Sequence, residues 1–132
     1  MTMSIKISVG VGELIDKITI LEIKQAKISK PKKLKNINHE LSLLNQERSQ
    51  LGMKSGLEEL EKALKEINQK LWDIEDEIRL CESRGQFDEA FIELARSVYI
   101  TNDKRCEVKF KINELFGSEV IEEKSYEPYA VS

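Results

Sequence analysis

The chain has 132 residues, of which 34% are charged and 40% are hydrophobic, with two prolines and six glycines. This length and composition predict one soluble, mostly helical domain and are insufficient for two domains. The net charge of −3 excludes the global basic field that non-specific nucleic-acid binding requires, and no apolar run is long enough to predict a membrane span.

The first ten residues predict a short strand or an extended arm. Ile5, Ile7 and Val9 alternate with polar residues, which is typical of a strand. Because a lone strand leaves its backbone groups unpaired, we expect a mate. That mate is either residues 119–123 or the same strand in a second subunit.

The next two elements are predicted to be helices. The first runs from about Val11 to Ser29, and apolar residues cover most of its circumference. This distribution is typical of a helix with neighbours on several sides, and together with the lone strand it predicts a homodimer. Pro31 suits the first turn of the second helix, which Gly52 ends.

Two longer helices follow. The stretch Ser55–Glu58 fits a capping box that begins the third helix, and Gly85 ends it. Asp88 can cap the fourth helix, which Gly117 ends. The apolar residues of the third helix recur at alternating spacings of three and four, as in a coiled coil. They are Leu57, Leu60, Leu64, Ile67, Leu71, Ile74, Ile78 and Cys81.

The predicted fold is therefore all-α, with four main helices in two antiparallel hairpins that pack as a bundle. The bundle covers residues 11–117, and the third and fourth helices are the long ones. Residues 1–10 form the strand or arm, and residues 118–132 form an irregular acidic tail. We expect the whole chain, residues 1–132, to be a single helical domain.

A row of polar and aromatic side chains runs beside the apolar stripe of the third helix. At 100° per residue its members share one face, and the folded hairpin brings a second row of the fourth helix opposite it. The first helix adds Thr19 and Glu22, with Asp16 and Lys17 one turn earlier. We call the candidate site residues of this layer the polar seam: Lys17, Glu22, Asn68, Trp72, Glu75, Arg79, Arg96, Tyr99, Asn102, Asp103 and Arg105.

Three interpretations of the polar seam remain open. It can be a structural network that selects one helix register. It can be a pocket for a small anion, with the arginines binding and Glu75 or Asp103 acting as acid or base. It can also be a partner-binding surface centred on Trp72 and Tyr99, because aromatic residues and arginine dominate binding hot spots.

The position of the polar seam next to the apolar stripe gives a specific expectation. Either Glu75 or Glu22 should pair with an arginine in a water-poor layer, with the tryptophan covering one side. The candidate arginines are Arg79, Arg96 and Arg105.

Other features are less specific. Between Lys24 and Lys35 there are six lysines and no acid, which are either solvated side chains or a local contact for an anion. Cys81 and Cys106 lie inside helical patterns without metal-ligand spacing, which predicts small core residues in a reduced, cytoplasmic protein. We predict no metal site and no cofactor.

Four blocks of the sequence resemble an uncharacterised bacterial family, a domain of unknown function. The blocks are VGELIDKITILEIK, LWDIEDEIR, FIELARSVYITNDKR, and INELFGS followed by EEKSY. The resemblance extends from about Ser8 to Tyr129. It implies an association with cell-surface polysaccharide genes and supplies no reaction and no catalytic residue. Its blocks coincide with the polar seam, which favours a functional role for those residues.

Two functions follow as hypotheses. The first is a non-enzymatic helical accessory or protein-interaction protein that acts through the region of Trp72 and Tyr99. The second is a small all-α enzyme or binding protein for a phosphorylated or carboxylated metabolite. The second requires cations that converge on one cavity, with Lys17 and the three seam arginines as candidates. A closed network would favour the first hypothesis, and an open pocket lined by unpaired arginines would favour the second.

Overall fold

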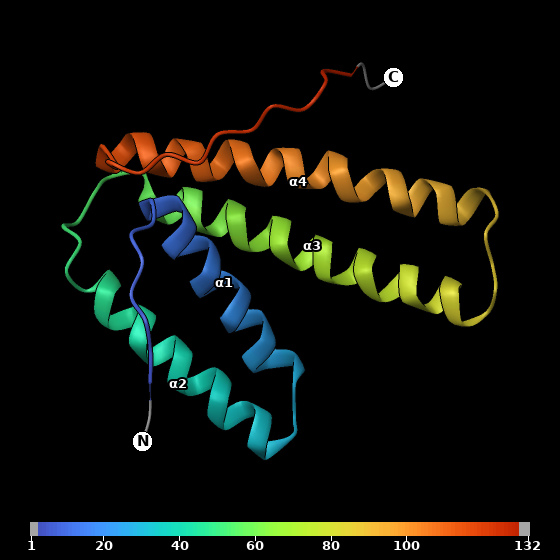
Figure 1. Ribbon diagram of the computed structural model, residues 1–132, viewed down its shortest axis with the longest axis horizontal. Coiled ribbons are helices and arrows are strands. Elements are labelled where there is room, and N and C mark those ends of the chain that lie inside the picture. Colours follow the sequence, from blue (N-terminus) through green and yellow to red (C-terminus); the bar gives the residue numbers. More distant parts are fainter. Residues whose placement is uncertain (1–2, 130–132) are drawn as a thin grey trace.

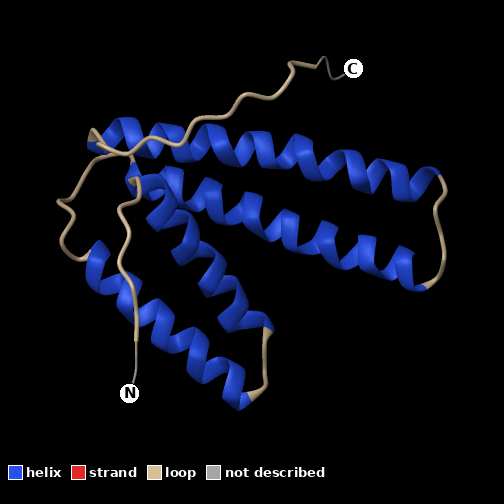
Figure 2. Cartoon of the chain, in the orientation of Figure 1, coloured by secondary structure: helices blue, strands red, loops and turns tan. Residues whose placement is uncertain are grey.

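The computed structural model describes residues 3–129 and is built from helices and connecting loops (Figure 2). The chain forms four helices, of which the last two are long (Figure 1). They are α1 (Val11–Lys27), α2 (Pro31–Arg48), α3 (Leu57–Ser83) and α4 (Glu89–Phe116). The all-α prediction with four main helices is confirmed.

Local sequence signals account for several helix ends. The side chain of Asp88 accepts a hydrogen bond of 3.3 Å from the backbone N–H of Phe91, and Gly117 ends α4 in the left-handed conformation with φ of 60°. The predicted capping box of α3 is wrong. Gly56, with φ of 96°, occupies the cap position, so Ser55 lies one residue too early to cap the helix.

The first two helices end earlier than the sequence predicted, at Lys27 and at Arg48. After α1, Ile28 is extended with ψ of 131°. Lys30 is extended as well, with ψ of 121°, because the ring of the following proline disfavours helical backbone at the residue before it.

Helix α1 is the shared element of the fold, since it packs against all three other helices. One of its faces packs on α2 and forms a core of Leu14, Ile18, Leu21, Ile37 and Leu41. Another face carries Ile15, which is fully buried against Leu64 of α3 and Ile112 of α4. The apolar circumference of α1 is thus covered within one chain, which removes one of the two reasons that the sequence offered for a homodimer.

The helices do not close into a four-helix bundle. Helices α3 and α4 lie side by side, whereas α1 and α2 diverge from them so that the ribbon resembles a V (Figure 1). Among the described residues, the backbone of α2 approaches that of α1 and of no other helix. An ion pair between Arg48 and Glu61, with one N–O distance of 2.6 Å, links the end of α2 to α3. The bundle prediction is wrong because the four helices do not share one core. Helix α1 packs against the α3–α4 pair, whereas α2, within residues 3–129, packs against α1 only.

The predicted strand over residues 5–9 is absent, and residues 3–129 contain no strand. Ile5 and Ile7 are 83% and 76% exposed. The proposed mate within the chain, residues 119–123, lies beside α4 instead, where Glu122 approaches Lys109. Without a paired backbone a strand is not stable. Pairing of this segment across two subunits stays a prediction.

The two glycines before and inside the first turn of α1 allow it to approach α4 closely. A Cβ atom on Gly10 would lie 2.6 Å from the carbonyl oxygen of Val120, and one on Gly12 would overlap the carbonyl group of Lys109. The backbone N–H of Gly12 donates to Oδ1 of Asn113 at 2.7 Å. These glycines therefore serve helix packing.

We expect Gly12→Ala to lower the free energy of unfolding by about 1–3 kcal/mol, because the added methyl group overpacks the contact with α4. Gly52→Ala is the matched control, since a Cβ at Gly52 has no atom within 4 Å. Chemical denaturation of both variants checks this, and equal stabilities would contradict the close contact.

Candidate functional site

A buried carboxylate lies where α1, α3 and α4 meet. Asp16 of α1 has no exposed surface. Arg105 of α4 donates to both of its oxygens, with an Nε–Oδ1 distance of 2.9 Å. Asn68 of α3 donates to Oδ1 at 2.9 Å. Three helices thus contribute to one charge-assisted cluster, with the planar fork of arginine matched to a carboxylate.

The same cluster includes a buried hydroxyl. Nδ2 of Asn68 also lies 2.9 Å from Oγ1 of Thr19, which in turn donates to the backbone carbonyl of Asp16 at 2.8 Å. Among the described residues, every buried side-chain nitrogen and oxygen has a hydrogen-bond partner. The cluster around Asp16 is therefore fully hydrogen-bonded, and two of its members, Asn68 and Arg105, belong to the polar seam.

A second cation extends the network towards the tail. Nζ of the buried Lys109 lies 2.6 Å from Glu13, 3.4 Å from Glu122 and 4.0 Å from Asp16. Burial lowers the pKa of Lys109, but its hydrogen bond and charge interaction with Glu13 outweigh burial, so the pKa is raised. The hydrogen bond to Asp16 likewise raises the pKa of Arg105. Both groups stay charged, which suits a structural role and disfavours a lysine base or nucleophile.

An open groove of about 470 Å³ lies next to this network, between α1, α3 and α4. Its apolar part comes from α1 and α3, and its polar part includes two asparagines and two arginines. The lining residues are Ile20, Ile23, Lys24, Asn68, Leu71, Trp72, Glu75, Asp76, Arg79, Asn102 and Arg105. The structure therefore brings six of the eleven polar-seam residues to one groove.

The predicted pair of Glu75 and Arg79 is present, but its environment was predicted wrongly. Both belong to α3, one turn apart, and their side chains are 45% and 71% exposed. Glu22 pairs with Lys65 at 3.4 Å and not with an arginine. The water-poor pair is Asp16 with Arg105. The sequence did not single out Asp16, because Glu13 and Glu22 lie on the same predicted helix and local spacing does not tell which of the three carboxylates is buried.

The remaining residues of the polar seam lie outside the groove. The rings of Tyr99 and Tyr129 meet edge to face with centroids 5.4 Å apart, and the hydroxyl of Tyr129 donates to Asp103. Tyr99 and Asp103 thus contact the tail, whereas Lys17 and Arg96 are exposed. Trp72 and Tyr99 do not form one continuous groove.

Residues 3–129 contain no group of three or more acidic, histidine or cysteine side chains placed to hold a metal ion. In the same part of the chain, none of the helices combines the length and the apolar character needed to cross a membrane.

We expect Asp16→Ala to lower the free energy of unfolding by about 3 kcal/mol, the lower end of the range for breaking a buried pair. The lower end applies because the Arg105 side chain keeps 28% exposure and can reach water. Glu75→Ala is the control, since it removes an exposed pair and should change stability by about 0.5 kcal/mol or less. Chemical denaturation checks both, and a larger loss for Glu75→Ala would contradict this assignment.

The contact of the tail with α4 should depend on pH. The hydrogen bond to Asp103 raises the pKa of Tyr129 to about 12. Since the folded pKa is raised, the contact is fully present below the unfolded pKa, about 10, and is lost as the pH rises towards 12. In a tyrosinate absorbance titration we expect a late component that disappears in Tyr129→Phe. Loss of an early component instead would show that the tail does not dock there.

Comparisons with known proteins give a family and little else. Neither the curated proteins nor the solved structures contain a match to the chain. A family model described as a family of unknown function, DUF6165, matches residues 3–132. Because that match covers nearly the whole length, the chain belongs to the family of unknown function DUF6165.

Proposed function

We propose that the chain is a non-enzymatic helical interaction protein whose groove receives an apolar side chain of a partner protein. The observation that carries this proposal is the state of the two arginines beside Trp72. Arg105 is held by Asp16, and Arg79 is held by Glu75. The groove therefore presents an aromatic ring and aliphatic side chains next to two guanidinium groups, of which Arg105 is bound to a buried carboxylate and Arg79 forms an exposed pair.

The composition of the groove supports this class of ligand. Ile20, Ile23, Leu71 and Trp72 form the apolar part of the lining, and two asparagines belong to the same lining. Tryptophan and arginine are the residues that most often dominate protein interfaces, and a partly apolar centre with a polar rim is the usual arrangement.

The competing function, binding or conversion of a small anionic metabolite, has weaker support. It requires several free cations that converge on one cavity, but Lys17 and Arg96 lie outside the groove. Among the described residues, Lys24 is the one lining cation without an ion pair. The carboxylates of Glu75 and Asp76 line the same groove and offset its positive charge. A nearly neutral groove offers little attraction to a phosphate or carboxylate.

The cellular setting of this proposal comes from the sequence alone. A cytoplasmic accessory role follows from the free cysteines and the composition. A role near cell-surface polysaccharide synthesis follows from the family resemblance. Neither the location nor the polysaccharide role depends on the groove geometry, so evidence against either one leaves the proposal for the groove unchanged.

Photo-cross-linking tests the groove. A photoreactive residue replaces Asp76, which lines the groove, or Lys62, an exposed position of α3 that does not. In cells that produce the protein naturally, we expect one predominant protein adduct from position 76. This adduct should be lost when Trp72→Ala is added, and position 62 should give no equivalent adduct.

The metabolite hypothesis is tested with the same groove. Trp72 is the only tryptophan of the chain, so its fluorescence reports occupancy directly. If phosphorylated or carboxylated metabolites change this fluorescence and raise the melting temperature while position 76 yields no protein adduct, the interaction proposal is wrong and the alternative holds.

A further inference from the structure

Two segments of the chain carry concentrated surface charge of opposite sign. The first, which we call the basic elbow, is residues 24–35 and joins α1 to α2; it carries six lysines and no acid. The second, the acidic arm, is residues 73–93, the end of the α3–α4 pair that is joined by the loop at Gly85. It carries eight carboxylates and two arginines, so the two segments have opposite net charges of equal size.

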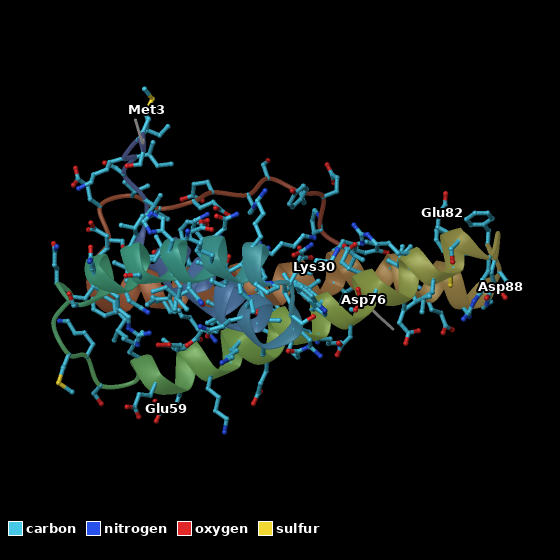
Figure 3. All side chains as sticks on the ribbon, turned by 90° about the horizontal axis from the view of Figure 1, so that it is seen from below. Met3, Lys30, Glu59, Asp76, Glu82 and Asp88 are labelled. Carbon is cyan, nitrogen blue, oxygen red and sulfur yellow. The ribbon has the colours of Figure 1, made fainter. Side chains whose placement is uncertain are left out.

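These charges are solvent-exposed and mostly have no partner within the chain. Five of the six elbow lysines are exposed, and in residues 3–129 none of the six forms an ion pair. Of the eight carboxylates of the arm, Glu75 alone pairs with a cation within the described residues. Figure 3 shows Lys30 on the elbow, whereas Asp76, Glu82 and Asp88 follow one another along the arm. Like charges within a cluster repel one another, so an opposite charge that covers either segment lowers its free energy.

The acidic arm also exposes apolar side chains. Leu80, Phe87 and Ile92 are 50%, 56% and 47% exposed. This end of α3 and α4 extends past α1, so no third helix covers it (Figure 1). Carboxylates around exposed aromatic and aliphatic groups are typical of a surface that contacts protein.

We propose that the partner of this surface is a second copy of the chain, with the basic elbow of each copy on the acidic arm of the other. Elbow and arm lie on the two limbs of the V (Figure 1). Rotation by 180° about an axis at the open side of the V brings each elbow opposite an arm. The two contacts are then identical, as the two-fold symmetry of a dimer requires.

Charge complementarity selects this partner over others. A nucleic acid or an anionic membrane would satisfy the elbow and be repelled by the arm. A basic protein would satisfy the arm alone. Only a partner with both charges in a matching arrangement satisfies both segments, and the chain itself has that arrangement. This inference rests on the charges of the two segments and not on what the groove at Trp72 binds, although Lys24, Glu75, Asp76 and Arg79 belong to both.

Two charge-reversal variants test the dimer. The elbow variant combines Lys32→Glu with Lys33→Glu, and the arm variant combines Glu77→Lys with Glu82→Lys; all four positions are exposed and outside the groove. Light scattering at high micromolar concentration and low salt should give twice the monomer mass of 15.2 kDa for the wild-type protein. Each variant alone should give the monomer mass.

Mixing the two variants provides the decisive control. Every contact between them joins opposite charges, so the mixture should recover the dimer mass, which misfolded variants could not do. In 1 M salt, where screening acts over about 3 Å, the wild-type dimer should dissociate at least in part. A monomeric wild-type protein, dimeric single variants, or a mixture that stays monomeric would each overturn the proposal.

Discussion

The buried carboxylate of Asp16 is the constraint on which the relative placement of α1, α3 and α4 depends. A charge without water costs several kcal/mol unless donors surround it. Asn68 and Arg105 supply those donors from two different helices. Sliding α3 or α4 by one residue would turn a donor away and strand the charge. Apolar contacts are not directional, whereas hydrogen bonds weaken steeply when their distance and angle change, so the polar cluster specifies the register more sharply than the apolar core does.

The same cluster determines what the groove can bind. Arg105 lines the groove, yet its guanidinium is held by Asp16. An arginine that the sequence suggested as an anion-binding group is therefore already bound to a carboxylate of the same chain. What remains accessible is Trp72 with the aliphatic residues of the lining, which supports the proposal that the groove receives an apolar side chain of a protein.

The well-anchored end of the molecule and the exposed end lie at opposite ends of the α3–α4 pair. At one end the N–H of Val11 donates to Ser118 Oγ at 3.1 Å, Gly12 contacts α4, and Lys109 binds Glu13. At the other end, α3 and α4 contact each other only, and of the eight carboxylates there Glu75 alone forms an ion pair within the described residues. Packing holds the first end, whereas the second is available for association.

The sequence alone determined the helices and part of the groove. The four helices follow from apolar spacing, and the limits of α4 follow from Asp88 and Gly117, because these signals act through neighbouring residues. The grouping of Asn68, Trp72, Glu75 and Arg79 also follows from helical geometry, and all four line the groove.

Only the tertiary structure decided which carboxylate is buried. Asp16 and Glu75 both stand beside apolar residues, and the choice depends on the rotation of α1 about its own axis against two helices. Tyr99 and Asp103 likewise lie outside the groove and contact Tyr129 of the tail, which lies 26 residues beyond Asp103 in the chain. Such contacts are set by the summed packing of the whole chain, and no local pattern encodes them.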